Sequence, residues 1–390
     1  MSNPVKPSGR IDEFDGLRGI LSLWVAVSHM LCWCGFVTVR FISDHGASKR
    51  LWDEFVFAAG AVETFMILSG FVITHLLYTD RQPFGKFMLG RFFRIYPVYL
   101  FCLLLGFGSI FFVPHILEQA QWRDTVYFQW EQSHSDCELA RPIAHLVAHL
   151  TLLFGLVPEQ ILPQSAATLL TPAWSISLEW QFYLVAPLIA LAVRSRTGIL
   201  LLAAVCCGDF FYPRFWGNAF LPGKLSLFLV GIGFYHLYRN QDKWKSFNQI
   251  PYAILAVFCA VILVSWHWVA LSIWVLVFGC LFIRAGDSGR FSVILLTLRR
   301  VLLHPVLQYL GRMSYPVYLI HWPVIILLMY GLLQIDPDIT EGKALIFMCS
   351  LGLPIILAVA FLLHRFLEVP LMRLGKKYSG QSTKSGSYVR

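Results

Sequence analysis

The chain has 390 residues, of which 57% are hydrophobic and 14% are charged, and its formal net charge at pH 7 is +9. Soluble domains carry about 25% charged residues, so the composition excludes an ordinary soluble protein and indicates a membrane protein. The basic residues are spread over short segments between apolar runs, which favours a role in membrane topology. We therefore expect membrane lipids as partners and no nucleic acid.

The N-terminal residues 1–10 precede the first apolar run, and we expect them to form a cytoplasmic tail. They contain no short apolar core followed by a small-residue cleavage site, so no removable signal peptide is predicted. All of the nine cysteines except Cys137 lie in or beside apolar runs. Their positions suggest neither a disulfide framework nor a zinc site, so we expect no metal.

Ten apolar runs along the chain are predicted to cross a membrane. A helix needs about 20 residues to span about 30 Å of hydrocarbon, and lipid offers no partner for open backbone groups. The predicted fold class is therefore all-α, a polytopic membrane helix bundle of about ten transmembrane helices. The predicted spans are 19–38, 55–78, 95–115, 174–193, 199–212, 220–238, 250–266, 268–283, 314–334 and 344–364.

One further apolar stretch, residues 143–157, decides the topology. If it crossed the membrane, the basic clusters after residue 193 would lie outside, against the positive-inside rule. We therefore predict that it does not cross and that both termini are cytoplasmic. Residues 11–373 then form one membrane domain that contains a long, acidic outer loop at 116–173, and residues 374–390 form a basic cytoplasmic tail.

The first span carries Arg18, Ser22 and His29 on nearly the same helical face. Positions 11 apart lie about 20° from alignment and about 16 Å apart along a helix. An ionised group facing lipid costs on the order of several kcal/mol, so this face is expected to line a protein cavity or an aqueous crevice. The alternative is that Arg18 snorkels to the cytoplasmic interface and His29 is an ordinary core histidine.

Three later spans also carry polar side chains, and in two of them these residues are three or four positions apart and share one face. Inside a bundle, such residues either hydrogen-bond to one another or surround something polar. A purely structural polar network is the alternative, and Glu63 in particular fits a charge pair with a neighbour. The residues are Glu63; Ser175, Glu179 and Tyr183; and Ser314, Tyr318 and His321.

The predicted cytoplasmic loop between the second and third spans contains Arg91 and Arg94, three apart, with Lys86 just before them. Two guanidiniums so spaced can hold a phosphate through charge-assisted hydrogen bonds. The alternative is that they are topology anchors.

In the outer loop, His145 and His149 are four apart and could grip a metal, but no glutamate of an H-E-x-x-H pattern lies between them. Asp209 lies near the outer end of a predicted span, where it suits the membrane interface.

Several motifs in order resemble the integral-membrane acyltransferase 3 family of O-acyltransferases. The opening "DGLRG" with the Arg18 to His29 spacing is followed by "FMILSGFVIT" (65–74), "RFFRIYP" (91–97), "WSISLEWQFYL" (174–184), "SYPVYLIHWPV" (314–324) and "FLEVP" (366–370). The resemblance covers roughly residues 11–373, and the ordered set is far more specific than any one motif.

The resemblance implies a ten-helix enzyme in a bacterial inner membrane. It implies transfer of an acyl group, usually acetyl from cytoplasmic acetyl-CoA, to a hydroxyl of a glycan or lipid-linked acceptor at the outer side. The position of the family's second glutamate in "SVEEQFY" is Trp180 here, which allows a different acceptor class. The family's pattern assigns the essential pair to Arg18 and His29, the CoA end to Arg91 and Arg94, and the interior to Glu179 and His321.

Acyl transfer requires a base that takes the proton of the acceptor hydroxyl, and His29 is the candidate because imidazole titrates near neutral pH. Arg18 is expected to hold the polar arm of CoA or to stabilise an oxyanion, and Glu179 or Glu63 to fix a histidine tautomer. A covalent acyl intermediate on His29 or a serine stays open. The rival functions are a proton-coupled transporter that uses the intramembrane His and Glu residues, and a non-catalytic sensor or scaffold.

Overall fold

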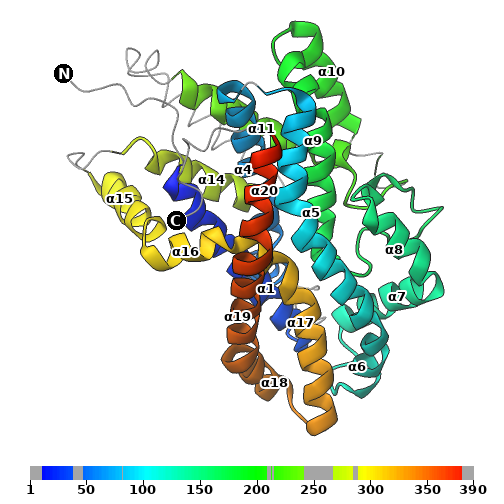
Figure 1. Cartoon of the computed structure of the whole chain (residues 1–390). Coiled ribbons are helices and arrows are strands. Elements are labelled where there is room, and N and C mark those ends of the chain that lie inside the picture. The colour runs from blue at the N-terminus through cyan, green and yellow to red at the C-terminus, as the bar shows by residue number, and fades with distance from the viewer. Residues whose placement is uncertain are drawn as a thin grey trace. The chain divides into compact units, whose positions relative to one another are not determined.

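The computed structural model describes residues 11–37, 47–80, 82–208, 212, 215–240, 267–283 and 289–379 (Figure 1). Every regular element in these ranges is helical, which confirms the all-α part of the prediction. The predicted span 250–266, Asp209 and the tails 1–10 and 380–390 lie outside the described residues. The chain divides into unit 1, with Met1–Leu21, Ala59–Arg81 and Leu225–Arg312, and unit 2, with Ser22–Ala58, Gln82–Lys224 and Met313–Arg390.

The first helix, α1 (Asp12–Trp33), contributes to both units because the division falls between Leu21 and Ser22. Its first turn holds Asp12, Glu13 and Asp15, whose negative charges suit the positive end of the helix dipole. Arg18 therefore belongs to unit 1, whereas Ser22 and His29 belong to unit 2.

In its described part, unit 1 comprises the start of α1 and five further helices. Its core is aromatic: the ring of Phe14 lies 5.1 Å from that of Phe71 and 5.5 Å from that of Trp274, centroid to centroid. The helices are α4 (Ala59–Thr79), α11 (Leu225–Arg239), α14 (Trp268–Cys280), α15 (Arg290–Leu302) and α16 (Pro305–Arg312).

Helices α4 and α11 pack backbone to backbone through glycine. A Cβ atom on Gly70 would lie 2.2 Å from the carbonyl oxygen of Phe228, and one on Gly231 would lie 2.0 Å from that of Ile67. Only residues without a side chain permit this approach, which is how helices commonly associate in lipid. The "LSGF" segment of α4 therefore has a packing role in unit 1.

Unit 2 is built on long helices. Helix α5 (Phe84–Ser109) continues through a 3₁₀ turn into α6 (Val113–Gln119), and α20 (Val369–Ser379) runs beside α5 (Figure 1). A Cβ on Gly375 of α20 would lie 2.6 Å from the Cβ of Phe93 on α5. The remaining long helices are α9 (Trp174–Ala192), α17 (Ser314–Ile335) and α19 (Leu353–Leu363), and π-helical turns at Met348–Gly352 and His364–Glu368 join α18 (Glu341–Phe347), α19 and α20.

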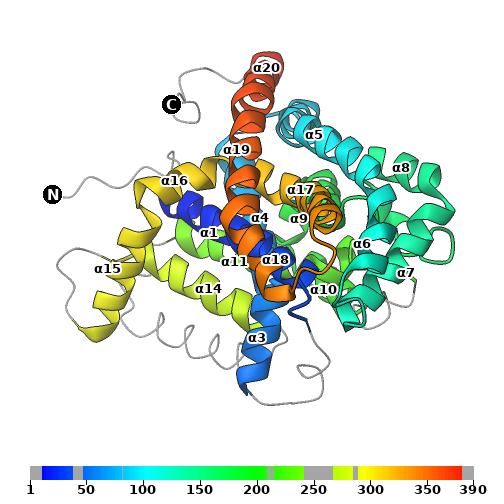
Figure 2. The ribbon, with the colours of Figure 1, turned by 90° about the horizontal axis from the view of Figure 1, so that it is seen from below.

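The predicted outer loop, 116–173, contains helices of its own. It contains α7 (Val126–Ala140) and α8 (Pro142–Leu150), which lie with α6 in Figure 2. The hydroxyls of Tyr96 and Tyr99 on α5 each donate a 2.9 Å hydrogen bond to backbone carbonyls at the end of α8. Helix α8 has nine residues, about 14 Å at 1.5 Å each, so it is too short to span a bilayer.

Six helical segments among the described residues are long and apolar enough to cross a membrane, and seven if the bent pair α15 and α16 counts as one span. They correspond to the first four and the last two predicted spans. Three other predicted spans form helices of only 12, 15 and 13 residues, namely α10 (Arg196–Cys207), α11 and α14. The chain is an integral membrane protein, but the count of ten spans and the orientation of the termini stay predictions.

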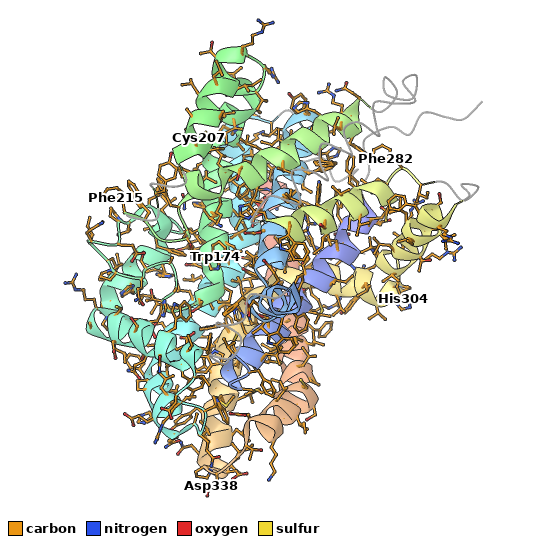
Figure 3. The ribbon with its side chains drawn as sticks, turned by 180° about the vertical axis from the view of Figure 1, so that it is seen from behind. Trp174, Cys207, Phe215, Phe282, His304 and Asp338 are labelled. Carbon is orange, nitrogen blue, oxygen red and sulfur yellow. The ribbon has the colours of Figure 1, made fainter. Side chains whose placement is uncertain are left out.

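Figure 3 labels Trp174, the first residue of α9, and Asp338, in the turn between α17 and α18. The same unit contains α3 (Ala47–Phe57), which precedes α4 and covers part of the range predicted as a span. Residues 374–379, predicted as the start of a tail, continue α20.

Candidate active site

The centre of the site is a pair of histidines from α1 and α17. His29 Nδ1 lies 2.8 Å from His321 Nε2, and the two rings are nearly parallel, 5.0 Å apart at their centroids. His321 is completely buried, and His29 is partly buried. The structure thus brings together two predicted site residues that are 292 positions apart in the chain.

The hydrogen bonds define the tautomer of each ring. His321 Nδ1 lies 3.0 Å from the carbonyl oxygen of Val317, which can only accept a hydrogen bond, so Nδ1 carries the proton. In the neutral ring Nε2 therefore carries a lone pair and can accept. His29 Nδ1 must then donate to that lone pair. In neutral His29 the basic nitrogen is therefore Nε2, which has no hydrogen-bond partner among the described residues. The arrangement presents one oriented base.

Aromatic side chains enclose this pair. The indole of Trp322 meets His29 edge to face, with 5.1 Å between ring centroids, and contacts the buried ring of Trp33 at 5.9 Å. Apolar rings around an imidazole exclude water and keep its neutral form available. Neither tryptophan was singled out from the sequence.

A chain of polar residues leads from this pair along α17 and α9. Tyr318, one turn before His321, lies 2.8 Å from Ser175, hydroxyl to hydroxyl, and donates to the carbonyl of Pro172 at 3.0 Å. One turn further along α9, Glu179 accepts a hydrogen bond from Tyr183. The predicted one-face spacing of these residues matches the way in which they meet.

The other end of this chain is basic. The Arg91 guanidinium lies 5.9 Å from the ring centroid of Tyr183, and Glu179 and Arg94 are close enough to act on its charge. Arg91 Nε is buried and has no hydrogen-bond partner among the described residues. This N–H group is free to bind an anion, which fits the predicted phosphate clamp.

Lys376 on α20 belongs to the same basic cluster, because both Arg94 and Arg91 act on its charge. Lys376 lies in the segment predicted as the cytoplasmic tail, 374–390. No local pattern in the sequence connects it with Arg94, 282 residues earlier. The packing of α20 on α5 creates the cluster. Lys86 is exposed in the first turn of α5, and no described contact joins it to these three residues.

Arg18 and Glu63 belong to unit 1. Arg18 forms an ion pair at 3.5 Å with Asp15, one turn earlier on α1. Glu63 accepts from or pairs with His267 Nδ1 at 2.7 Å within unit 1. Glu63 or Glu179 was expected to fix the tautomer of a histidine, and the histidine that Glu63 bonds is His267, whereas His29 is bonded by His321. Ser22 is buried.

The two histidines of α8 are structural in character. His145 Nδ1 bonds Thr168 Oγ1 at 2.9 Å, and His149 Nδ1 bonds the carbonyl of His145 at 2.8 Å. Burial lowers the pKa of His145 to about 4 and that of His149 to about 3. Both rings are neutral at pH 7, and the described residues contain no group of three or more side chains able to hold a metal ion around them.

Comparison with known proteins agrees with this architecture. The family profile described as an acyltransferase domain, acyltransferase 3, matches residues 11–365, and the chain belongs to this family of membrane acyltransferases. It is 27% identical over 398 residues to acyltransferase MdmB of Streptomyces mycarofaciens, covering 94% of this chain and 92% of that protein. No solved structure matches the chain.

A second relative carries the name of a more specific activity. O-acetyltransferase OatA of Staphylococcus aureus is 22% identical over 409 residues, which cover 91% of this chain and 59% of that protein. Protein 2 in the picA locus of Rhizobium radiobacter is 28% identical over 174 residues, 44% of this chain and 77% of that protein.

Proposed function

We propose that this protein transfers an acetyl group from cytoplasmic acetyl-CoA to a hydroxyl of a glycan or other envelope acceptor at the outer side of a bacterial inner membrane. The observation that carries the proposal is the His29–His321 pair, in which one imidazole nitrogen is oriented, basic and unoccupied by the described residues. The names of the two acyltransferase relatives support the class of reaction.

In the proposed reaction, His29 Nε2 takes the proton of the acceptor hydroxyl while its oxygen attacks the thioester carbonyl. The tetrahedral intermediate collapses, the carbon–sulfur bond breaks, and the departing CoA sulfur receives the proton from His29. The Nδ1–H bond to His321 strengthens while His29 is charged, so His321 acts as a positioning residue. The base returns to its starting tautomer.

The basic cluster of Arg91, Arg94 and Lys376 suits the phosphates of acetyl-CoA. The unpartnered Nε–H of Arg91 and the two further cations offer charge-assisted hydrogen bonds to an anion. Arg18 stays a proposed contact for the polar arm of CoA or for the oxyanion. The polar chain through Glu179 and Tyr318 connects the cluster with the histidines.

The experiment incubates membranes that contain the protein with labelled acetyl-CoA and cell-envelope fractions, and follows alkali-labile label. We expect His29→Ala to lower transfer by about 10³-fold, with Arg18→Ala nearly as severe. His304→Ala, which changes an exposed histidine of unit 1 (Figure 3), is the matched control.

Ordinary turnover by a folded His29→Ala protein would refute the assignment of the base. Substrate flux across the membrane without consumption of acetyl-CoA would favour the proton-coupled transporter instead. Tight ligand binding with neither flux nor transfer would favour a sensor.

A further inference from the structure

Unit 2 contains a second polar site that the proposed reaction does not use. A small pocket with room for about one water molecule, partly open to solvent, lies between α7, the start of α6, the segment before α9, and α17. Glu131, His134 and Glu138 of α7 line it, and so does Trp322 of α17. The three polar residues are spaced three and four apart, so one face of α7 supplies them all.

Each of these three side chains is more than nine-tenths buried: Glu131 is 4% exposed, and His134 and Glu138 are each 6% exposed. Each uses only one polar atom within the protein. Tyr127 donates to Glu131 Oε1 at 2.7 Å, the backbone N–H of Leu169 donates to Glu138 Oε2 at 2.8 Å, and His134 Nδ1 bonds the carbonyl of Trp130 at 2.7 Å.

The second polar atom of each side chain has no partner among the described residues. These atoms are Glu131 Oε2, Glu138 Oε1 and His134 Nε2, and all three side chains line the pocket. His134 Nδ1 must donate to the carbonyl, so Nε2 of the neutral ring is an acceptor. With both carboxyls ionised the pocket offers three acceptors, which an entering group with several N–H donors would satisfy.

The charge of the pocket indicates which donor it prefers. No lysine or arginine is among the described residues that line it. Burial raises the pKa of Glu131 to about 8, helped by the nearby Glu138, and raises that of Glu138 to about 7. Because these carboxyls are buried without an accompanying cation, they are partly protonated at neutral pH. A cation that entered would stabilise both carboxylates and release protons.

Size narrows the donor further. The enclosed part of the pocket has room only for a water-sized group, which matches a primary ammonium and excludes a sugar ring. The indole of Trp322, which also lines the pocket, can add a cation–π contact to a bound ammonium group. The same indole contacts His29 at 5.1 Å between ring centroids, so the pocket and the proposed base share one aromatic side chain.

We propose that this pocket holds the primary ammonium group of the acceptor, so that the acceptor is an amino sugar or another amine-bearing alcohol with its hydroxyl presented to His29. The assignment of the bound molecule as the acceptor rests on the proposed function. The ammonium donates to Glu131, Glu138 and His134, which replaces the partners that these groups lack within the chain.

The binding test uses purified full-length protein without any acyl donor. Methylammonium is the probe, with tetramethylammonium at equal ionic strength as a cation of the same charge that cannot enter or donate. We expect methylammonium to raise the thermal unfolding midpoint more than tetramethylammonium does, with proton release detected in weakly buffered solution at pH 7. Equal effects of the two cations, or no proton release, would overturn the ammonium site.

Variants locate the effect. Glu131→Gln and Glu138→Gln keep an oxygen for the bonds from Tyr127 and Leu169, so both should fold. Each is expected to weaken methylammonium binding by about 10-fold or more, because a hydrogen bond to a charged group contributes about 1.5–3 kcal/mol. Asp136→Asn, on the exposed face of the same helix, is the matched control and should bind normally.

The transfer test separates this inference from the proposed function. With the acceptor identified by labelling, Glu131→Gln should raise the KM for that acceptor and leave the KM for acetyl-CoA unchanged. If the acceptors are neutral molecules and Glu131→Gln and Glu138→Gln do not change the rate of transfer to them, the ammonium-binding role of the pocket is wrong. The proposed acetyltransferase activity would be unaffected by that result. Selective methylammonium binding with no transfer to any acceptor would retain the pocket and remove the proposed function.

Discussion

Two regions of unit 2 hold ionisable side chains of opposite kind, basic and acidic, at the two ends of one long helical run. Near the start of α5, Arg91, Arg94 and Lys376 form a basic cluster. Beyond its other end, where Val113 begins α6, Glu131 and Glu138 form an acidic pocket. From Arg91 to Val113 is 22 residues, about 33 Å of helix, which is the thickness of a bilayer core.

With a basic end and an acidic end, one helix bundle can serve two different substrates. The basic end would attract a polyanionic thioester and repel an ammonium-bearing acceptor. The carboxyls of the acidic end would do the opposite when they are ionised. The His29–His321 pair is linked to both ends, through Tyr318 on one side and Trp322 on the other. Changes at the pair should therefore alter the chemical step, whereas changes at either end should alter one KM.

The largest effect in this scheme belongs to the histidine pair. His321→Ala should lower kcat by about 10²-fold, because His29 loses the acceptor of its Nδ1–H and can adopt the wrong tautomer. Both KM values should stay near their original values. His321→Asn supplies an amide oxygen at a similar place and should recover part of kcat, which a purely structural role would not produce.

Equal loss of kcat in His321→Ala and His321→Asn, with a normal unfolding midpoint, would show that His321 does not act by accepting this hydrogen bond. Acidification would distinguish the two roles further. If His29 stays correctly positioned, the plot of kcat against pH should show a single titration at its original pH. If positioning is lost, that titration should move to a different pH.

The second effect tests the basic end. Arg91→Ala with Arg94→Ala should raise the KM for acetyl-CoA by about 10- to 100-fold, since charge-assisted hydrogen bonds contribute about 1.5–3 kcal/mol. The KM for the acceptor should not change. Arg194→Ala with Arg196→Ala removes the same charge from the turn after α9 and from the first residue of α10, and is the matched control. Unchanged dependence on acetyl-CoA would leave Arg91 and Arg94 as topology anchors.

The sequence was informative where geometry is local. Helical spacing placed Ser175, Glu179 and Tyr183 on one face of α9, and the structure joins Glu179 to Tyr183. It also placed Tyr318 and His321 together on α17, and their rings lie 6.2 Å apart. Residues three or four apart on a helix are neighbours whatever surrounds them, so one sequence suffices for such predictions.

Contacts between helices were beyond its reach. The partner of His29 is 292 residues away, and the partner of Glu63 is 204 residues away at His267. Nothing in the composition of either helix selects these pairs, because helix packing decides them. The acidic site at Glu131 was likewise not predicted. Its segment is polar overall and was predicted to belong to a loop, but it forms α7, which buries one of its faces.

A smaller effect concerns Lys376, which only the packing of α20 on α5 brings to the basic end. Lys376→Ala should raise the KM for acetyl-CoA by about 5-fold, the size expected for a half-exposed charge. Lys377→Ala, which removes an exposed charge at the next position, should have no such effect. Equal KM values for the two variants would remove Lys376 from the cluster.

The smallest effect is a pH dependence of stability at the acidic end. The folded protein raises the pKa of Glu131 from its ordinary value of 4.5 to about 8, so the folded state holds a proton that the unfolded chain releases. The favourable contribution is complete below about pH 4.5 and is lost as the pH rises through about 8. Glu131→Gln cannot titrate, so its unfolding midpoint should fall less between pH 5.5 and 8.5 than that of the unsubstituted protein. An identical fall in both proteins would mean that Glu131 is ionised throughout this range, and the acidic end would then carry a fixed negative charge without any bound cation.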